Sequence, residues 1–311
     1  MKSEAEVKEF FANELHCELL PLEIYRKRKV KKIRIYLYVA LILAIPLVFG
    51  IIQQLGVFIG FVIFGILLTL GYAYETLGKM QDELQEKFKS TALPRLLEFM
   101  FHQFNYLPNQ RIARSTLVES QLISDEITVV EGEDYMRFKL GETGIMFCET
   151  IVFRRNKSDG PIFHGVFLAA SFNKHFKSVT IILPKSKVSF LSKIIKYKIF
   201  DTFKIIKLED TEFNKEFTVY STDQVESRYI LSTSFMNRLL AYKQKVKRKI
   251  SVSFVHDKMF CTIPNYINLF EPALFESFYD FSFIQKSYDA LKQYTDIVED
   301  LNLNLRIWNK D

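Results

Sequence analysis

The feature that most constrains this chain is an uninterrupted uncharged stretch from Ile35 to Tyr74. Gln53 and Gln54 divide its forty residues into a run of eighteen and a run of twenty. At about 1.5 Å per helical residue, each run would span ~27–30 Å, which matches a bilayer hydrocarbon core of about 30 Å. A single helix would be about twice too long and would place two amide side chains near the bilayer centre. The stretch therefore predicts two transmembrane helices joined by a tight turn.

A strongly basic run precedes this stretch and predicts its orientation. Seven of the nine residues from 26 to 34 are Lys or Arg, and the positive-inside rule places such runs in the cytoplasm. A hairpin returns the chain to the same side, so we expect a multi-pass protein with both termini cytoplasmic. A buried hairpin in a soluble protein is the alternative, although such helices normally carry a polar stripe. The residues expected to contact the membrane surface are Arg26, Lys27, Arg28, Lys29, Lys31, Lys32 and Arg34.

Composition narrows the class of partner. The 42 basic and 36 acidic residues give a net charge of +6. The first 34 residues hold nine basic and six acidic residues, so half of that charge lies before the apolar stretch. A mildly basic remainder argues against a nucleic-acid partner, and the expected partners are the lipid bilayer and a protein of unknown identity. Cys17, Cys148 and Cys261 form no disulfide framework, which suits a reducing cytosol.

The residues before the hairpin predict an amphipathic helix. Ser3 and Glu6 have the spacing of a capping box, and apolar residues recur at three- to four-residue spacing up to Leu19. Pro21 is expected to end this helix. The predicted organisation is an N-terminal helix and basic juxtamembrane segment over residues 1–34, a transmembrane helical hairpin over 35–74, and a cytosolic α+β domain over 75–311.

The cytosolic domain is predicted to combine an antiparallel sheet with flanking helices, which makes the fold class α+β. Residues 76–105 are expected to be largely helical, with a kink or restart at Pro94. Alternating apolar residues and turn signals predict strands between about 110 and 185, including a turn at 131–134. Further predictions are a short helix near 188–195, strands near 203–208 and 217–220, helices capped at 222–223 and 232–233, a β-hairpin over 250–263, a long helix through Val298 and a final strand over 301–307.

Asp223, Glu226 and Arg228 form the best local candidate for chemistry. On a helix, residues 223 and 226 share a face, and two carboxylates on one face could bind a cation or act in acid–base catalysis. The favoured interpretation is structural, in which Asp223 caps the helix and Arg228 pairs with an acidic group. No phosphate-binding glycine loop and no metal-ligand spacing occurs in the sequence, so we expect no cofactor and no metal.

Several segments resemble the bacterial domain-of-unknown-function family 3137. The most specific are Lys207–Phe213 and Phe217–Leu231, in which Ser227 stands where a small residue, often Ala, is expected. Looser matches are Gly132–Tyr135, Phe270-Glu271 and Leu301–Trp308. The resemblance implies a bacterial integral membrane protein with a cytosolic domain, and we expect this protein in the inner cell membrane. It implies no activity and no catalytic residue.

We therefore predict an uncharacterised integral membrane protein that serves as a membrane-tethered cytosolic interaction or scaffold module. The alternatives are a membrane-bound enzyme using Asp223, Glu226 or Arg228, and a lipid or small-ligand sensor at the cytosolic face. Of these, an interaction module agrees best with the absence of catalytic motifs from the sequence.

Overall fold

The computed structural model describes residues 1–52, 56–123, 127–154, 158, 160–171, 175–185, 202–266, 268–272 and 274–301. The chain divides into two units. The helical unit comprises Lys2–Phe99 and Phe270–Tyr288, and the sheet unit comprises Met1, Met100–Leu269 and Asp289–Asp311. The predicted α+β class is confirmed, because helices of membrane-spanning length precede an antiparallel sheet with flanking helices.

The helical unit begins with the predicted capping box. The Ser3 side chain accepts a hydrogen bond from the Glu6 backbone, and the Glu6 carboxylate accepts one from the Ser3 backbone. These two bonds satisfy N–H groups that the first turn of a helix leaves without partners. The N-terminal helical segments are α1 (Glu4–Phe10), the π-helical turn η1 (Phe11–Leu15), α2 (His16–Ile52), α3 (Gly56–Ser90) and α4 (Ala92–Met100).

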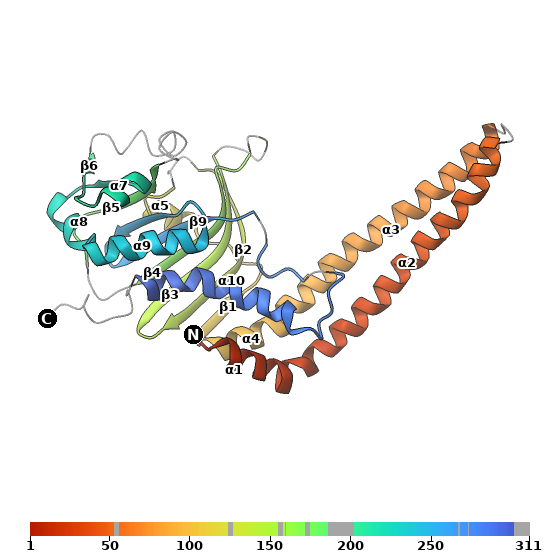
Figure 1. Cartoon of the computed structure of the whole chain (residues 1–311), viewed down its shortest axis with the longest axis horizontal. Helices are drawn as coiled ribbons and strands as arrows, with labels where there is room; N and C mark the ends of the chain where they lie inside the picture. Colours follow the sequence, from red (N-terminus) through yellow and green to blue (C-terminus); the bar gives the residue numbers. More distant parts are fainter. Residues whose placement is uncertain are drawn as a thin grey trace. The chain divides into compact units, whose positions relative to one another are not determined.

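Helices α2 and α3 lie side by side as a long hairpin (Figure 1). Both belong to helices that are long and apolar enough to cross a membrane. Only 6% of the most apolar window of the first and 11% of that of the second is buried. The predicted turn at Gln53 and Gln54 lies outside the described residues. The apolar side chains of the hairpin therefore face outward, unlike those of a core helix in a soluble protein.

The prediction that Pro21 ends the first helix is wrong, because α2 continues through it to Ile52. An interior proline removes one backbone hydrogen bond and costs about 3 kcal/mol in a helix. The neighbouring side chains of Leu19 and Leu22 are 0% and 4% exposed, and their burial offsets this cost. The restart expected at Pro94 is confirmed by the break between α3 and α4.

Among the described residues, nine strands form one sheet in the order β1-β2-β3-β4-β9-β8-β5-β7-β6. Every neighbouring pair is antiparallel, as predicted. The strands are β1 (His102–Leu107), β2 (Val129–Leu140), β3 (Thr143–Phe153), β4 (Phe163–Ser171), β5 (Thr180–Pro184), β6 (Lys204–Ile206), β7 (Phe217–Ser221), β8 (Ser251–Val255) and β9 (Lys258–Pro264).

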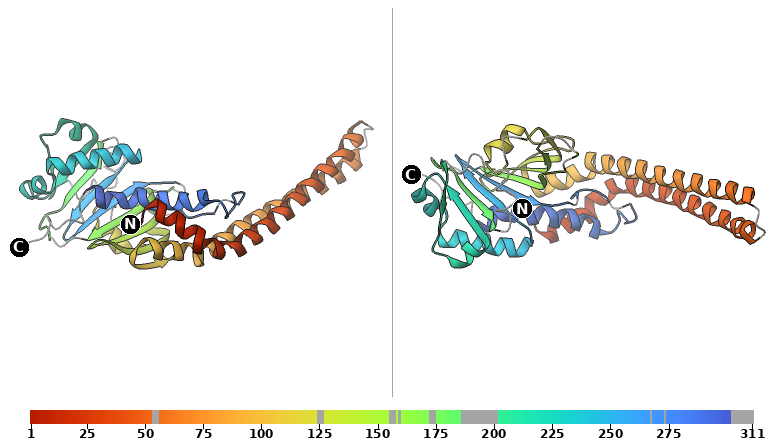
Figure 2. Two further views of the ribbon diagram at one scale, coloured as in Figure 1. Left: turned by 60° about the horizontal axis from the view of Figure 1, so that its bottom comes forward. Right: turned by 90° about the horizontal axis from the view of Figure 1, so that it is seen from above.

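Helices cover both faces of this sheet (Figures 1 and 2). Adjacent residues of β3 show the two faces, because Cys148 joins a buried cluster with Leu117 of α5, whereas the Phe147 ring contacts Tyr294 of α10. On the second face, the Tyr242 hydroxyl of α9 donates to the Gln293 carbonyl of α10. The helices are α5 (Arg114–Glu119), α7 (Thr211–Glu216), α8 (Gln224–Ile230), α9 (Thr233–Val246) and α10 (Phe281–Asp300), whose first residues belong to the helical unit.

Two expectations for the start of the sheet are wrong. Helix α4 ends at Met100 and residues 102–107 form an edge strand rather than the end of a helix. The turn expected at 131–134 is absent, because β2 runs on to Leu140 with a bulge between Glu133 and Met136. Asp134 takes the left-handed φ of +56°, and its N–H donates to the Pro108 carbonyl at 2.8 Å. The turn-like sequence therefore forms a bulge within the strand.

The C-terminal elements follow the sequence closely. Asp223 and Ser232 cap α8 and α9, and β8 and β9 form the predicted hairpin. The long helix through Val298 is α10. The predicted helix near 188–195 and the strand over 301–307 fall, apart from Leu301, outside the described residues.

Candidate functional site

The structure places the predicted polar cluster at the start of α8, where two of its members hold backbone groups. The Asp223 carboxylate accepts hydrogen bonds from the N–H groups of Val225 at 2.7 Å and Glu226 at 3.1 Å. The Glu226 carboxylate accepts from the Ser178 N–H at 2.7 Å and from its hydroxyl at 2.5 Å. Burial raises the pKa of Glu226, but the hydrogen bonds from Ser178 and Lys177 outweigh it and the pKa lies below its usual range.

Arg228, the third member, also binds backbone. Its Nη2 donates to the Lys207 carbonyl at 3.1 Å, and its Nη1 lies 3.9 Å from an Oε1 of the exposed Glu209. Asp223 caps its own helix, Glu226 ties α8 to the segment before β5, and Arg228 ties it to the segment after β6. These contacts give all three residues a structural role.

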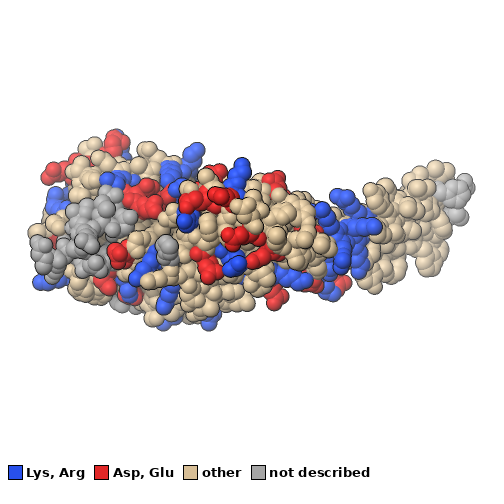
Figure 3. All heavy atoms as spheres, turned by 90° about the horizontal axis from the view of Figure 1, so that it is seen from below, with Lys and Arg blue, Asp and Glu red and all other residues tan. Residues whose placement is uncertain are grey.

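The basic run of α2 splits into two groups. Arg26 is 8% exposed and donates twice to Glu23, and Lys29 lies 3.6 Å from Glu83. The other members are exposed at the foot of the uncharged part of the hairpin (Figure 3). The exposed members are Lys27, Arg28, Lys31, Lys32 and Arg34.

Glu23 holds the segment 270–288 against α2 inside the helical unit. It is fully buried and accepts from Arg26 at 2.7 and 2.9 Å and from the Phe278 N–H at 3.0 Å. Burial raises the pKa of Glu23, but the Arg26 guanidinium and the Phe278 amide outweigh it and bring the pKa to about 2. Arg26 was predicted at the membrane surface from the basic run, and in the structure it is the partner of the buried Glu23 carboxylate.

Three carboxylates that the sequence did not single out meet at the β2 bulge. One oxygen from each of Glu133, Asp134 and Glu149 lies within 4.8 Å of the others, and oxygen ligands of this kind suit Ca²⁺ or Mg²⁺. The cluster also has protein donors, since the Tyr106 hydroxyl donates to Asp134 at 2.5 Å and the Leu269 N–H to Glu149 at 3.0 Å. Burial and the nearby Asp134 charge raise the pKa of Tyr106, which keeps its hydroxyl protonated as a donor.

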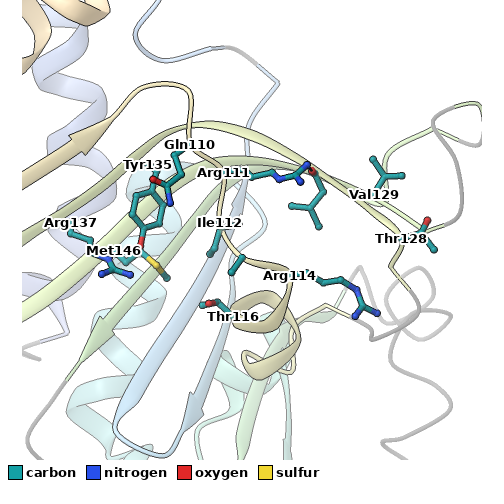
Figure 4. Close-up of a pocket in the computed structure, with 12 residues that line it drawn as sticks. Gln110, Arg111, Ile112, Arg114, Thr116, Thr128, Val129, Tyr135, Arg137 and Met146 are labelled. Atoms are coloured by element: carbon teal, nitrogen blue, oxygen red, sulfur yellow. Dashed lines mark hydrogen bonds between the residues drawn. The ribbon is translucent and has the colours of Figure 1, made fainter.

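A cavity of about 760 Å³ lies in the sheet unit between β2 and the segment that leads into α5 (Figure 4). Three of the side chains that line it are cationic, those of Arg111, Arg114 and Arg137, and no Asp or Glu is among the described residues that line it. Its lining also includes the apolar side chains of Ile112, Val129, Val130 and Met146. Its volume falls within the range of about 300–1,000 Å³ that small-molecule sites occupy.

Two arginines of this cavity are held by neutral groups. Arg111 donates from Nη1 to the Val130 carbonyl at 2.7 Å. Arg137 donates from Nε to the Tyr135 hydroxyl at 2.5 Å and lies 5.3 Å from the centre of that ring. Neither forms an ion pair with a carboxylate among the residues that the structure describes. Both guanidinium charges therefore lie in the cavity wall without an anionic partner in that part of the chain.

The fold and these sites define an α+β protein with two helices that could span a membrane and a cationic cavity in its sheet unit. Residues 161–303 match the family described as "Protein of unknown function (DUF3137)", and the chain resembles that family, as its sequence predicts. The match includes the segments 207–213 and 217–231 and leaves out 132–135.

Comparisons with curated proteins and with solved structures give no further information about function. No curated protein matches the chain. Among solved structures, the mycobacterial trehalose monomycolate transport factor A, TtfA, is similar with a TM-score of 0.34 and 9% identity over 64% of this chain and 89% of that one. A similarity of this degree carries no conclusion about function.

Proposed function

We propose that the protein is an integral membrane protein whose sheet unit works as a tethered interaction module at the cytosolic face. The exposed apolar surface of the α2–α3 hairpin carries this proposal. Side chains such as Leu41, Phe61 and Leu67 are 67%, 73% and 62% exposed. A soluble monomer rarely exposes an apolar surface of this extent, whereas a hydrocarbon solvent favours it.

The charge pattern supports an orientation for the hairpin. Five exposed basic residues of α2 precede the uncharged segment, and cytoplasmic anionic headgroups attract such runs by about 1 kcal/mol per Lys or Arg. In our proposal the bilayer is the inner membrane of a bacterial cell. Because a hairpin returns the chain to its starting side, both termini are then cytoplasmic.

An interaction module agrees better with the site geometry than a membrane-bound enzyme. Asp223, Glu226 and Arg228 hold helix α8 in place through backbone contacts, so the residues that motivated the enzyme alternative have another role. A lipid or small-ligand sensor is the second candidate, because the sheet unit contains the arginine-lined cavity.

Alkaline extraction of membranes, followed by cysteine labelling, tests the proposal. The protein is expected in the membrane fraction after extraction. Cys17 is exposed, whereas Cys148 and Cys261 are buried, so Cys17 is the natural reporter. A membrane-impermeant maleimide should label Cys17 in inside-out vesicles and leave it unlabelled in intact cells, and labelling in intact cells would contradict the orientation.

The interaction role needs its own experiment. Cross-linking in intact cells, followed by purification in a neutral detergent, should recover the same partner protein in independent preparations. A variant that removes the exposed α8 side chain of Val225, which is 81% exposed, provides a folded control. Repeated recovery of the protein alone, without a partner or a second copy, would count against an interaction module.

A further inference from the structure

One loop of the helical unit exposes an aromatic ring although its backbone is held in place. This loop covers residues 274–280 and leads into α10. Arg26 of α2 donates to the Leu274 carbonyl at 3.3 Å, and the buried Glu23 carboxylate accepts from a backbone N–H further along the loop at 3.0 Å. Between these two attachments, the Phe275 side chain is 70% exposed. The loop therefore presents a large apolar group at a fixed place on the hairpin.

The packing of the loop gives its level along the hairpin. Leu274 packs against a buried cluster that includes Val30 and Ile33 of α2. These two residues precede Ile35, where the uncharged stretch begins, by five and two positions. At about 1.5 Å per residue, the separation along the helix axis is ~3–8 Å. The headgroup region on each side of a bilayer is about 5–7 Å thick, so a hairpin that fills the hydrocarbon core places this loop among the headgroups.

Tyrosines mark the same level on both helices. Tyr36 and Tyr38 lie at the start of the uncharged stretch on α2, and Tyr72 and Tyr74 lie at its end on α3. Tyr38, Tyr72 and Tyr74 are 63%, 54% and 80% exposed. Tyrosine is enriched where a membrane meets water, because its ring is apolar and its hydroxyl is polar. The sequence has no tyrosine between the two pairs, so they mark one interface, next to the basic run.

Four basic side chains at this interface have no carboxylate partner among the described residues. The other three members of the basic run lie 2.7–3.6 Å from a glutamate. At about 100° per residue, the four occupy an arc of roughly 160° on the side of α2 away from Val30 and Ile33. Figure 3 shows basic side chains gathered where the uncharged hairpin begins. An arc of this width suits a layer of headgroups better than one small ligand. The four exposed residues are Arg28, Lys31, Lys32 and Arg34.

The exposed ring and the four cations suit the same partner. The carboxylate beside the ring, that of Glu276, is paired with Lys286 at 2.5 Å, so it adds little negative charge to this surface. We propose that the loop and the four cations together bind the anionic phospholipid headgroups of the membrane in which the hairpin lies. The ring of Phe275 enters the interface and the lipid phosphates meet the cations. This inference rests on the proposed membrane location of the hairpin and adds the loop as a third contact with the membrane.

Tryptophan quenching in liposomes tests this inference on the full-length protein. Trp308→Phe removes the only tryptophan of the chain, and Phe275→Trp, Leu41→Trp or Val225→Trp then introduces a single reporter. The replaced side chains are 70%, 67% and 81% exposed, so each site has room for the larger ring. The liposomes contain equal amounts of phosphatidylcholine and phosphatidylglycerol, and one of the two lipids carries bromine on its acyl chains. Bromine quenches only nearby tryptophan, so quenching reports which lipid lies beside the reporter.

The reporter at residue 275 should be quenched. Brominated phosphatidylglycerol should quench it at least about twofold more than brominated phosphatidylcholine, because each nearby Lys or Arg favours anionic headgroups by roughly fivefold. The reporter at residue 41 should be quenched by both lipids and the reporter at residue 225 by neither. Quenching at residue 41 without quenching at residue 275 would overturn this inference and leave the hairpin proposal in place. Absence of quenching at residue 41 would overturn both, and equal quenching by the two lipids at residue 275 would overturn the assignment of anionic lipids.

Charge-removing variants then locate the source of the lipid preference. In the protein with the reporter at residue 275, Lys31→Gln/Lys32→Gln should lower the ratio of the two quenching efficiencies towards one. Lys204→Gln/Lys207→Gln is the matched control, because both lysines are exposed on the sheet unit and the same charge is lost. Circular dichroism of each variant shows whether it is folded. A ratio that the first pair leaves unchanged, or that the control pair lowers equally, would overturn the role of the cations.

Discussion

Phenylalanine side chains have opposite environments in the sheet unit and in the uncharged part of the α2–α3 hairpin. Phe147, Phe167 and Phe260 of the sheet unit are 0% exposed, whereas Phe61 and Phe64 of the hairpin are 73% and 65% exposed. Water favours the first arrangement, because burying such a side chain contributes about 1.5–3 kcal/mol. The second arrangement is favourable where the surroundings are themselves apolar. The comparison agrees with the proposed membrane location of the hairpin, and the following predictions test whether the hairpin and the sheet unit lie in different solvents.

Charges introduced into the hairpin should have the largest effect. Leu41 and Leu67 lie in the uncharged parts of α2 and α3, and an Asp at the centre of a membrane helix costs about 2.5–3.5 kcal/mol. The double variant Leu41→Asp/Leu67→Asp should therefore be largely lost from membranes after alkaline extraction. Val225→Asp, on an exposed position of the sheet unit, should be retained. Equal retention of both variants would show that the hairpin does not lie in hydrocarbon.

The second-largest effect is expected from truncating one buried phenylalanine of the sheet unit, whereas truncating one exposed phenylalanine of the hairpin should leave the stability of the sheet unit unchanged. Phe147→Ala removes a ring that packs against Tyr294 at 5.9 Å and should destabilise the sheet unit by about 3–5 kcal/mol. Phe64→Ala should leave unfolding of the sheet unit unchanged. Denaturant unfolding in detergent, followed by near-UV circular dichroism, measures both. Similar shifts for the two variants would contradict the division into two environments.

Acid should destabilise the helical unit through Glu23. Its folded pKa of about 2 lies below the unfolded value, so its stabilising effect is complete above pH ~4.5 and is lost as the pH falls towards 2. The shift corresponds to about 3 kcal/mol at neutral pH. Thermal unfolding between pH 2 and pH 7 should show this loss, and Glu23→Gln should be less stable and less dependent on pH.

A second glutamate provides the control for this acid effect. Glu6 also has a pKa of about 2, for which the backbone N–H of Ser3 is the main cause, but its carboxylate lies on the exposed first turn of α1. Solvent screens an exposed pair, so Glu6→Gln should change the pH dependence less than Glu23→Gln. The reverse order would contradict the role assigned to Glu23.

Removal of the α8 cap should give the smallest effect. Asp223→Ala loses two hydrogen bonds to the first turn of α8 and should cost about 1 kcal/mol, whereas Asp223→Ser should retain most of the stability. Urea unfolding measures the difference. If Asp223→Ala is as stable as the native protein, the structural assignment of this residue is wrong.

The sequence correctly predicted those helix caps and turns that are determined by residues a few positions apart. The capping box at Ser3, the caps at Asp223 and Ser232 and the hairpin turn between β8 and β9 depend on residues within a few positions of one another. The apolar stretch likewise predicted a helical hairpin from its length and lack of charge. Pro21 was misjudged because burial of its neighbours outweighed its local preference.

The carboxylate cluster and the arginine-lined cavity depend on contacts between segments that are distant in the sequence, and no local pattern specifies these contacts. Glu133 and Glu149 are direct partners in the β2–β3 register, so a correct register would have revealed the carboxylate cluster. The turn predicted at 131–134 broke that strand and hid the pairing. The arginine-lined cavity requires the segment 110–116 to lie over β2 on both sides of the bulge. Asp223, Glu226 and Arg228 lie close together in the sequence because they belong to the start of one helix. In the structure Asp223 caps α8, and Glu226 and Arg228 bind it to neighbouring segments.

Spin labels on the hairpin test its proposed solvent most directly. Leu41→Cys and Leu67→Cys, each in a Cys17→Ser background, are labelled in liposomes and compared with Val225→Cys on the sheet unit. Collision rates with oxygen, which concentrates in hydrocarbon, and with a water-soluble nickel chelate report the environment of each label. If the hairpin lies in hydrocarbon, collisions with oxygen dominate at residues 41 and 67 and collisions with the nickel chelate dominate at residue 225. Dominance of the nickel chelate at residues 41 and 67 would contradict it.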